Sequence, residues 1–178
     1  MNNVYITRVS RFLPNQPVGN DEMESKLGII NGQESKARRI VLRNNEIKTR
    51  YYAIDEHGDL THNNAELAKE AVELLCDDDF KCDQIELLSC GTTSPDQILP
   101  SHAAMVHGLL KNGNMEINSS TGACCSSMSA LKYGYLAVKA EQVSNAVCTG
   151  SERFSSWLKS DILSMKYPIL LVWRKDLF

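Results

Sequence analysis

The chain has 178 residues, of which 43% are hydrophobic and 23% are charged, proportions typical of one ordinary globular domain. A formal net charge of −3 does not indicate the basic surface that binds nucleic acid. Residues 1–10 lack the apolar core of a signal peptide, and the longest apolar run, residues 169–173, is too short to cross a bilayer. We therefore expect a cytoplasmic protein without a membrane span.

The first half of the chain predicts a strand, two helices and a basic stretch between the helices. Residues 4–9 alternate as a strand does, and residues 21–27 fit a short helix. Residues 31–50 are polar and basic, and residues 64–75 have the apolar periodicity of a longer helix. The expected caps are Asn20 or Asp21 and Gly28 for the first helix, and Asn63 or Asn64 for the second.

The second half of the chain predicts three apolar strands that alternate with two helices. The strands cover residues 85–90, 115–118 and 145–149, and the helices cover residues 101–110 and 124–141. This alternation indicates an α/β fold with a mostly parallel sheet covered by helices. Functional residues gather at the carboxyl ends of such strands, and each strand here ends in a turn of small or polar residues. These turns are residues 91–95, 119–124 and 150–152.

The cysteines are scattered along the chain without Cys-x-x-Cys spacing. Because no export signal is visible, we expect the thiols to be reduced. No group of cysteines and histidines has the spacing of metal ligands, so no metal site is expected. The six cysteines are Cys76, Cys82, Cys90, Cys124, Cys125 and Cys148.

Cys124 lies where the last predicted helix begins, directly after a turn of small residues. The partial positive charge of a helix N-terminus favours the thiolate, which is the nucleophilic form of a cysteine. Small neighbours would let a substrate carbonyl approach the sulfur, and exposed backbone N–H groups would stabilise an oxyanion. A buried structural cysteine remains an open alternative, because free cysteines are among the most buried residues.

The segment that carries Cys124 resembles the nucleophile helix of thiolase-fold condensing enzymes. In that family a small or apolar residue precedes the cysteine, and Ala-Leu or Ala-Ile follows six and seven positions later. Ala130 and Leu131 stand at this distance from Cys124, so the register selects Cys124 rather than Cys125. Residues 99–104, Leu-Pro-Ser-His-Ala-Ala, resemble the Phe-Pro-Ser-Ala-Ala element of β-ketoacyl-acyl carrier protein synthase III, with matching spacing to the cysteine.

Further segments extend this resemblance over residues 1–158. Arg43, Lys48 and Arg50 resemble the family's Arg-Thr-Gly-Ile-Arg-x-Arg segment with about one residue inserted, and residues 145–152 resemble the strand and Gly-x-Glu turn that close its N-terminal half. The segments Lys-Ala-Arg-Arg-Ile and Ser-Pro-Asp-Gln-Ile-Leu-Pro-Ser-His-Ala-Ala look most similar to ketosynthases of dialkylresorcinol and cyclic-diketone biosynthesis. The chain thus resembles the N-terminal half of a thiolase-like fold.

The resemblance implies an acyltransferase that performs a decarboxylating Claisen condensation in fatty acid or polyketide-like lipid biosynthesis. Cys124 would receive an acyl group from coenzyme A or acyl carrier protein, and a malonyl- or β-ketoacyl-thioester would supply the carbon nucleophile. Arg43, Lys48 and Arg50 would meet the phosphates of coenzyme A or the acidic carrier protein, or they are solvated surface residues. Thr92 and Leu99 would border the substrate pocket, with Leu99 reaching across a homodimer. No bound cofactor is implied.

The resemblance covers only half of the family's fold. The catalytic histidine and asparagine of these enzymes lie in their second half, and residues 159–178 form a divergent apolar tail that suggests a truncated or frameshifted chain. His57 and His62 are expected on the surface, and His102 and His107 stand about 140° apart on one helix, so none obviously replaces the missing histidine. We therefore expect acylation of the cysteine but poor decarboxylation.

Two other functions remain open from the sequence. A catalytically incomplete fragment would act as a dimerising or interaction module, because half of a thiolase fold leaves apolar surface exposed. A thiol hydrolase or redox protein would use Cys124 and Cys125, although adjacent cysteines rarely form an unstrained disulfide.

Overall fold

A computed structural model describes residues 3–29, 32–33, 37–155 and 157–158. Its centre is a three-stranded parallel sheet in the order β4-β3-β5. The middle strand β3 (Leu87–Gly91) pairs with β4 (Glu116–Ser120) on one side and with β5 (Ala146–Gly150) on the other. Gly91 lies opposite both Ser120 and Gly150, so the three carboxyl ends are level at one edge of the sheet.

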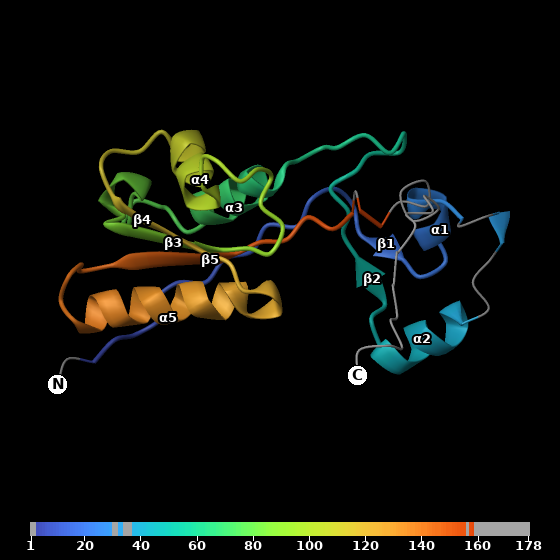
Figure 1. The fold of residues 1–178 in the computed structure, drawn as a ribbon, viewed down its shortest axis with the longest axis horizontal. Coiled ribbons are helices and arrows are strands. Elements are labelled where there is room, and N and C mark those ends of the chain that lie inside the picture. The colour runs from blue at the N-terminus through green and yellow to red at the C-terminus, as the bar shows by residue number, and fades with distance from the viewer. Residues whose placement is uncertain (1–2, 30–31, 34–36, 156, 159–178) are drawn as a thin grey trace, which may run out of the picture.

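Helices cover both faces of this sheet (Figure 1). α3 (Asn64–Glu73) and α4 (His102–Leu110) lie on one face, and α5 (Ser126–Lys139) lies on the other. The structure therefore confirms the α/β fold and the parallel, covered sheet that the alternation of strands and helices predicted.

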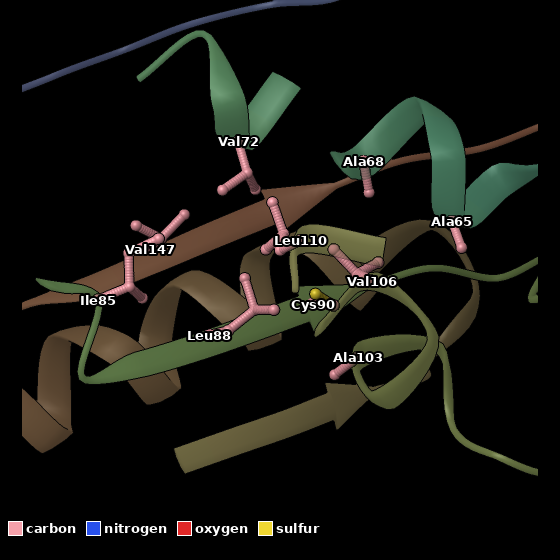
Figure 2. Packing of buried hydrophobic residues seen from close by; sticks show 10 residues of the cluster. All are labelled: Ala65, Ala68, Val72, Ile85, Leu88, Cys90, Ala103, Val106, Leu110 and Val147. Atoms are coloured by element: carbon pink, nitrogen blue, oxygen red, sulfur yellow. The ribbon is translucent and has the colours of Figure 1, made fainter. Parts of the chain in front are cut away.

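The main apolar core lies between the sheet and the helices α3 and α4 (Figure 2). β3 is buried at every position, which explains why its sequence is apolar without alternation. Fully burying one aliphatic side chain stabilises the fold by about 1.5–3 kcal/mol, so this layer is the main source of stability for the sheet. The core side chains are Ala65, Ala68, Val72, Ile85, Leu88, Cys90, Ala103, Val106, Leu110 and Val147.

The start of α3 is fixed by a capping box. The Asn63 side chain accepts a hydrogen bond from the Glu66 backbone N–H, and the Glu66 carboxylate accepts one from the Asn63 N–H. The Asp96 carboxylate accepts two more, from the N–H groups of Asn64 and Ala65, each at 2.9 Å. Of the two predicted caps, Asn63 is therefore the cap, and Asn64 is buried behind it.

A smaller unit lies beside the sheet and contains the basic stretch (Figure 1). β1 (Val18–Gly19) and β2 (Thr49–Arg50) form an antiparallel pair, accompanied by α1 (Met23–Leu27) and α2 (Arg38–Asn45). The sequence did not predict α2. No residue of this helix is buried, and its three apolar residues, 40–42, stand inside a polar and basic stretch that does not resemble a core helix.

The predicted strand at residues 4–9 was wrong, because these residues are extended but belong to no ladder. Val9 is 86% exposed, and the segment is attached to the end of α3 by side-chain contacts instead. Arg8 bonds to the Leu75 carbonyl and to Asp77, and the Ser10 hydroxyl donates to the Ala71 carbonyl. Apolar alternation marks extended backbone, whereas a strand also needs an adjacent edge with which to pair.

The expectation of reduced thiols was wrong for one pair of cysteines. Cys76 and Cys82 form a disulfide, with their Cα atoms 5.4 Å apart. A tight turn between them, closed by a hydrogen bond from the Asp77 N–H to the Phe80 carbonyl, brings the two residues together after α3 ends. The cysteines that remain free are Cys90, Cys124, Cys125 and Cys148.

The predicted division into residues 1–158 and a divergent tail of residues 159–178 stays a prediction, since the tail lies outside the described residues. Within the described part of the chain, no helix combines the length and hydrophobicity needed to cross a membrane.

Candidate active site

Cys124 lies on an exposed turn between β4 and α5. The turn is one short 3-10 helix, η3 (Ala123–Cys125), and the α-helix proper begins directly after Cys125. Cys124 and Cys125 are both exposed free thiols, whereas Cys90 lies in the core, where burial raises its pKa to about 11. Burial also raises the pKa of Cys148. The exposed turn therefore carries the accessible thiols among the described free cysteines.

Two hydroxyl groups hold the carbonyl that precedes Cys124. The Thr93 Oγ1 donates to the Ala123 carbonyl oxygen at 2.6 Å, and the Ser126 Oγ donates to the same oxygen at 2.7 Å. The Ser126 Oγ also accepts a hydrogen bond from the Gly122 N–H at 3.0 Å. Ala123 has a φ of 49°, a left-handed conformation that is unfavourable for a residue with a Cβ. These hydrogen bonds stabilise the turn although the left-handed conformation of Ala123 is unfavourable.

The carboxyl ends of β3 and β5 lie close against the first turn of α5. A Cβ on Gly91 would overlap the backbone of Ser126 and Ser127, and a Cβ on Gly150 would overlap the Ser127 side chain. Only glycine allows this close approach of strand and helix. The small residues at these strand exits thus bring β3 and β5 against the turn that holds Cys124.

A polar network lies behind this turn and is centred on Glu152. Its carboxylate accepts hydrogen bonds from the Thr93 N–H at 2.6 Å, from the Ser94 N–H at 3.1 Å and from the Ser94 hydroxyl at 2.6 Å. Partial burial by itself would raise the pKa of Glu152, but these hydrogen bonds outweigh it and lower the pKa below its ordinary value. The carboxylate is therefore a fixed anchor for the loop after β3.

Thr92 lies inside this network, although the resemblance placed it in the substrate pocket. It is 1% exposed, and its Oγ1 accepts a hydrogen bond from the buried Asn64 side chain at 2.8 Å. The next residue, Thr93, is exposed and makes the contact with the turn of Cys124. The sequence did not identify Thr93, because the pair Thr92-Thr93 does not indicate which of the two hydroxyls points toward the turn of Cys124.

His102 is buried on the far side of the same network. It is 3% exposed, its Nε2 lies 3.1 Å from the Ser151 hydroxyl, and its Nδ1 has no hydrogen-bond partner among the described atoms. Burial lowers the pKa of His102, while the nearby Asp96 and Glu152 oppose this effect. No described hydrogen bond joins His102 to the turn of Cys124, so its geometry offers no substitute for a catalytic histidine beside the thiol.

Of the other predicted site residues, Leu99, Arg43 and Lys48 are exposed, and Arg50 is half-buried with an Nη1 that has no hydrogen-bond partner among the described atoms. Leu99 is 82% exposed, on the loop between β3 and α4. Arg43 and Lys48 are exposed in the smaller unit, and the Arg50 guanidinium donates to the Ile47 carbonyl at 3.4 Å. The strands of the sheet run toward this unit, as Figure 1 shows. The basic residues therefore lie beyond the same sheet edge as Cys124, and within the described residues no hydrogen bond or ion pair joins them to its turn.

Among the described residues, no group of three or more histidine, cysteine, aspartate or glutamate side chains is arranged to hold a metal ion. The chemistry that the geometry supports is that of an exposed thiol next to backbone N–H groups and hydroxyls.

Curated relatives share sequence with most of this chain, although no protein-family model matches it. The β-ketoacyl-acyl carrier protein synthase III of Anaplasma marginale (strain St. Maries) is 30% identical over 148 residues, which are 83% of this chain and 42% of that enzyme. The enzyme of the same name from Clostridium acetobutylicum is 28% identical over 159 residues, 89% of this chain and 45% of its own length. The chain thus spans less than half of the relatives it matches.

Solved structures of condensing enzymes share the fold. A tetronic acid condensing enzyme superimposes with a TM-score of 0.67 and 21% identity, over 90% of this chain and 47% of its own. The β-ketoacyl-acyl carrier protein synthase III of Thermus thermophilus gives a TM-score of 0.67 and 19% identity, over 89% and 46% of the two chains. The chain therefore has part of the thiolase fold of these condensing enzymes, and its sequence is similar to part of β-ketoacyl-acyl carrier protein synthase III.

Proposed function

We propose that the chain carries the acyl-accepting centre of a condensing acyltransferase, with Cys124 as the nucleophile. One observation carries the proposal: an exposed thiol stands on a turn braced by hydroxyls at the carboxyl edge of the parallel sheet. The register of Cys124 with Ala130 and Leu131 supports the same choice.

The proposed first step is a thioester exchange. The Cys124 thiolate attacks the carbonyl carbon of an acyl-thioester and forms a tetrahedral oxyanion, which the Cys124 backbone N–H helps to stabilise. The bond from that carbon to the carrier sulfur then breaks, the carrier leaves as a thiolate that takes up a proton, and the acyl group remains on Cys124.

The carrier is proposed to be coenzyme A or the phosphopantetheine of acyl carrier protein. Arg43, Lys48 and Arg50 supply positive charge for its phosphates, since guanidinium groups bind phosphate oxygens well. Leu99 and Thr92 stay proposed pocket residues, and the exposed Leu99 is available to reach a second subunit in a homodimer. A cytoplasmic location and a role in fatty acid or polyketide-like lipid synthesis belong to the same proposal.

The second step, decarboxylating condensation with a malonyl- or β-ketoacyl-thioester, needs an acid–base partner for the thioester enolate. Among the described histidines none hydrogen-bonds to the turn of Cys124, and His102 is buried with its Nε2 at the Ser151 hydroxyl. We therefore expect the described part of the chain to support acylation and not to support efficient condensation.

Mass spectrometry of the intact protein after incubation with acetyl-CoA and longer acyl-CoA tests the proposal. The unsubstituted chain and Cys125→Ala should each gain one acyl group, and Cys124→Ala should gain none. Hydroxylamine should remove the added mass, since it cleaves thioesters. Equal acylation of Cys124→Ala would contradict the role of this thiol.

A second candidate, an interaction module without catalysis, is favoured by one observation. α5 exposes several large apolar side chains that a helix in a globular protein normally buries, namely Met128, Leu131, Tyr135 and Leu136. The acylation assay distinguishes the two candidates. The acyltransferase requires acylation of Cys124, whereas an interaction module needs no reactive thiol.

A further inference from the structure

We propose that Thr93, assisted by Ser126, is a positioning residue that aims the Cys124 backbone N–H at the developing oxyanion. The inference rests on the proposed function of Cys124 as acyl acceptor. It concerns a residue that neither the cysteine motif nor the similarity to known enzymes singles out.

The geometry follows from the planarity of the peptide bond. In a trans peptide the carbonyl oxygen and the next N–H point in opposite directions in one plane, so fixing one fixes the other. The oxygen of the Ala123–Cys124 peptide accepts hydrogen bonds from Thr93 Oγ1 at 2.6 Å and from Ser126 Oγ at 2.7 Å. Its N–H, which belongs to Cys124, is therefore aimed away from the two hydroxyls.

The turn needs such bonds to keep this orientation. Ala123 has a φ of 49°, which residues with a Cβ rarely adopt, so the peptide would otherwise relax toward another conformation. An oxyanion donor is effective when its direction is set before the reaction, because no reorganisation is then needed as charge develops. The two hydroxyls supply this fixed direction.

Thr93 is itself held firmly enough to act as a brace. Its backbone N–H donates to the Glu152 carboxylate at 2.6 Å, and its Oγ1 also lies 3.4 Å from the Ser126 Oγ. Glu152 therefore anchors the residue from behind while the hydroxyl faces the turn. Thr93 is exposed and lies outside the apolar core, so replacing its hydroxyl should leave the fold in place.

Two reactions of the Cys124 thiol distinguish a role of Thr93 in orienting the oxyanion donor from a role in keeping the turn folded. Transfer of an acetyl group from acetyl-CoA passes through a tetrahedral oxyanion, whereas alkylation by iodoacetamide is a displacement at a saturated carbon and forms none. Both rates are measured by mass spectrometry in a Cys125→Ala background, so that Cys124 is the exposed free cysteine that reacts. Circular dichroism reports whether each variant remains folded.

In Thr93→Val, which keeps the shape and removes the hydroxyl, acetyl transfer should slow by about tenfold or more, while alkylation changes by less than about twofold. Thr93→Ser should restore acetyl transfer, and Thr7→Val, at an exposed threonine outside the basic segment, should change neither rate. Ser126→Ala should show the same split, which keeps the test decisive if Thr93→Val does not fold.

Three outcomes would overturn the inference. Unchanged acetyl transfer in Thr93→Val would show that the hydroxyl does not matter, and an equal fall of both rates would show a loss of thiol accessibility instead. If the unsubstituted chain is alkylated at Cys124 but takes no acetyl group, the proposed function itself fails and the positioning role falls with it.

Discussion

Cys124 and Cys90 belong to the same α/β unit, yet their surroundings give them opposite properties. Cys90 lies in the core of the middle strand, where burial raises its pKa to about 11 and keeps it an unreactive thiol. Cys124 stands on an exposed turn with hydroxyls around the preceding carbonyl. The position of a cysteine in this fold, rather than its presence, decides whether it can serve as a nucleophile.

Replacing Glu152, which anchors the loop after β3, should change the free energy of unfolding and the dependence of that free energy on pH. The carboxylate of Glu152 has a pKa below its ordinary value of 4.5, so it stabilises the folded chain above that pH and loses this effect as the pH falls through the lowered value. Glu152→Gln should lower the free energy of unfolding at neutral pH by about 1 kcal/mol, allowing for solvent screening of an exposed group.

Urea denaturation at neutral pH and well below pH 4.5 measures this effect. The difference between Glu152→Gln and the unsubstituted chain should shrink at the lower pH, because the native carboxylate is then protonated. Glu46→Gln, an exposed glutamate at the end of α2, should be close to neutral at both pH values. A difference that grows on acidification would contradict the assignment.

The sequence predicts Cys124 as the nucleophile, but it did not identify the residues that hold its turn. The register with Ala130 and Leu131, taken from the family resemblance, favours Cys124 over Cys125. The sequence could not decide between Thr92 and Thr93, because the direction of each hydroxyl depends on how the loop leaves β3. Burial of Thr92 against Asn64 turns Thr93 toward the cysteine, and this is a tertiary contact between segments far apart in the chain.

At the scale of elements, burial decides which predictions hold. β3 is buried at every position between helices, so its apolar run is visible in the sequence, whereas β5 is mostly half-buried. α2 buries no residue, and its short apolar segment, residues 40–42, stands inside a polar and basic stretch that hid the helix. Residues 4–9 have the alternation of a strand, but no described strand pairs with them. The disulfide between Cys76 and Cys82 depends on a turn that the spacing of the two cysteines does not reveal.

Two glycines offer a matched test of the strand–helix contact. Gly91 touches the backbone of Ser126, so Gly91→Ala should cost about 1–3 kcal/mol of stability and should slow acylation of Cys124 by displacing its turn. Gly108 lies inside α4, and apart from its own stretch of helix no described atom lies within 4 Å of the position that a Cβ would take there. Gly108→Ala should therefore be neutral or stabilising by up to about 1 kcal/mol.

Urea denaturation and the acetyl-CoA assay on both variants check these expectations. Equal stability of Gly91→Ala and the unsubstituted chain would show that the turn is not pressed against the strand end.

At the scale of the whole molecule, the chain exposes large apolar side chains on both a helix and a strand of the sheet unit. It spans less than half of the curated relatives it matches. Large apolar side chains are exposed on α5 and on the outer strand β4, among them Met128, Leu136 and Ile117. Exposed apolar surface marks interaction sites in globular proteins where it forms a contiguous patch.

We therefore expect the chain to associate with itself in solution. Sedimentation velocity over a range of concentrations should show an average mass that rises with concentration, and Leu136→Lys on α5 should weaken this association. Leu74→Lys, at an exposed position just after α3, is the matched control and should leave it unchanged. A monomer at every concentration would contradict the homodimer and the interaction module alike.

The most direct test of the central claim is to locate the acyl group on the chain. Cleavage after Lys111 and Lys132 releases residues 112–132, a single peptide that contains both Cys124 and Cys125. After incubation with acetyl-CoA, fragment ions that divide the two cysteines identify the modified sulfur. The account predicts the acetyl group on Cys124 alone. An acetyl group on Cys125, or an unmodified peptide from a folded chain, would contradict it.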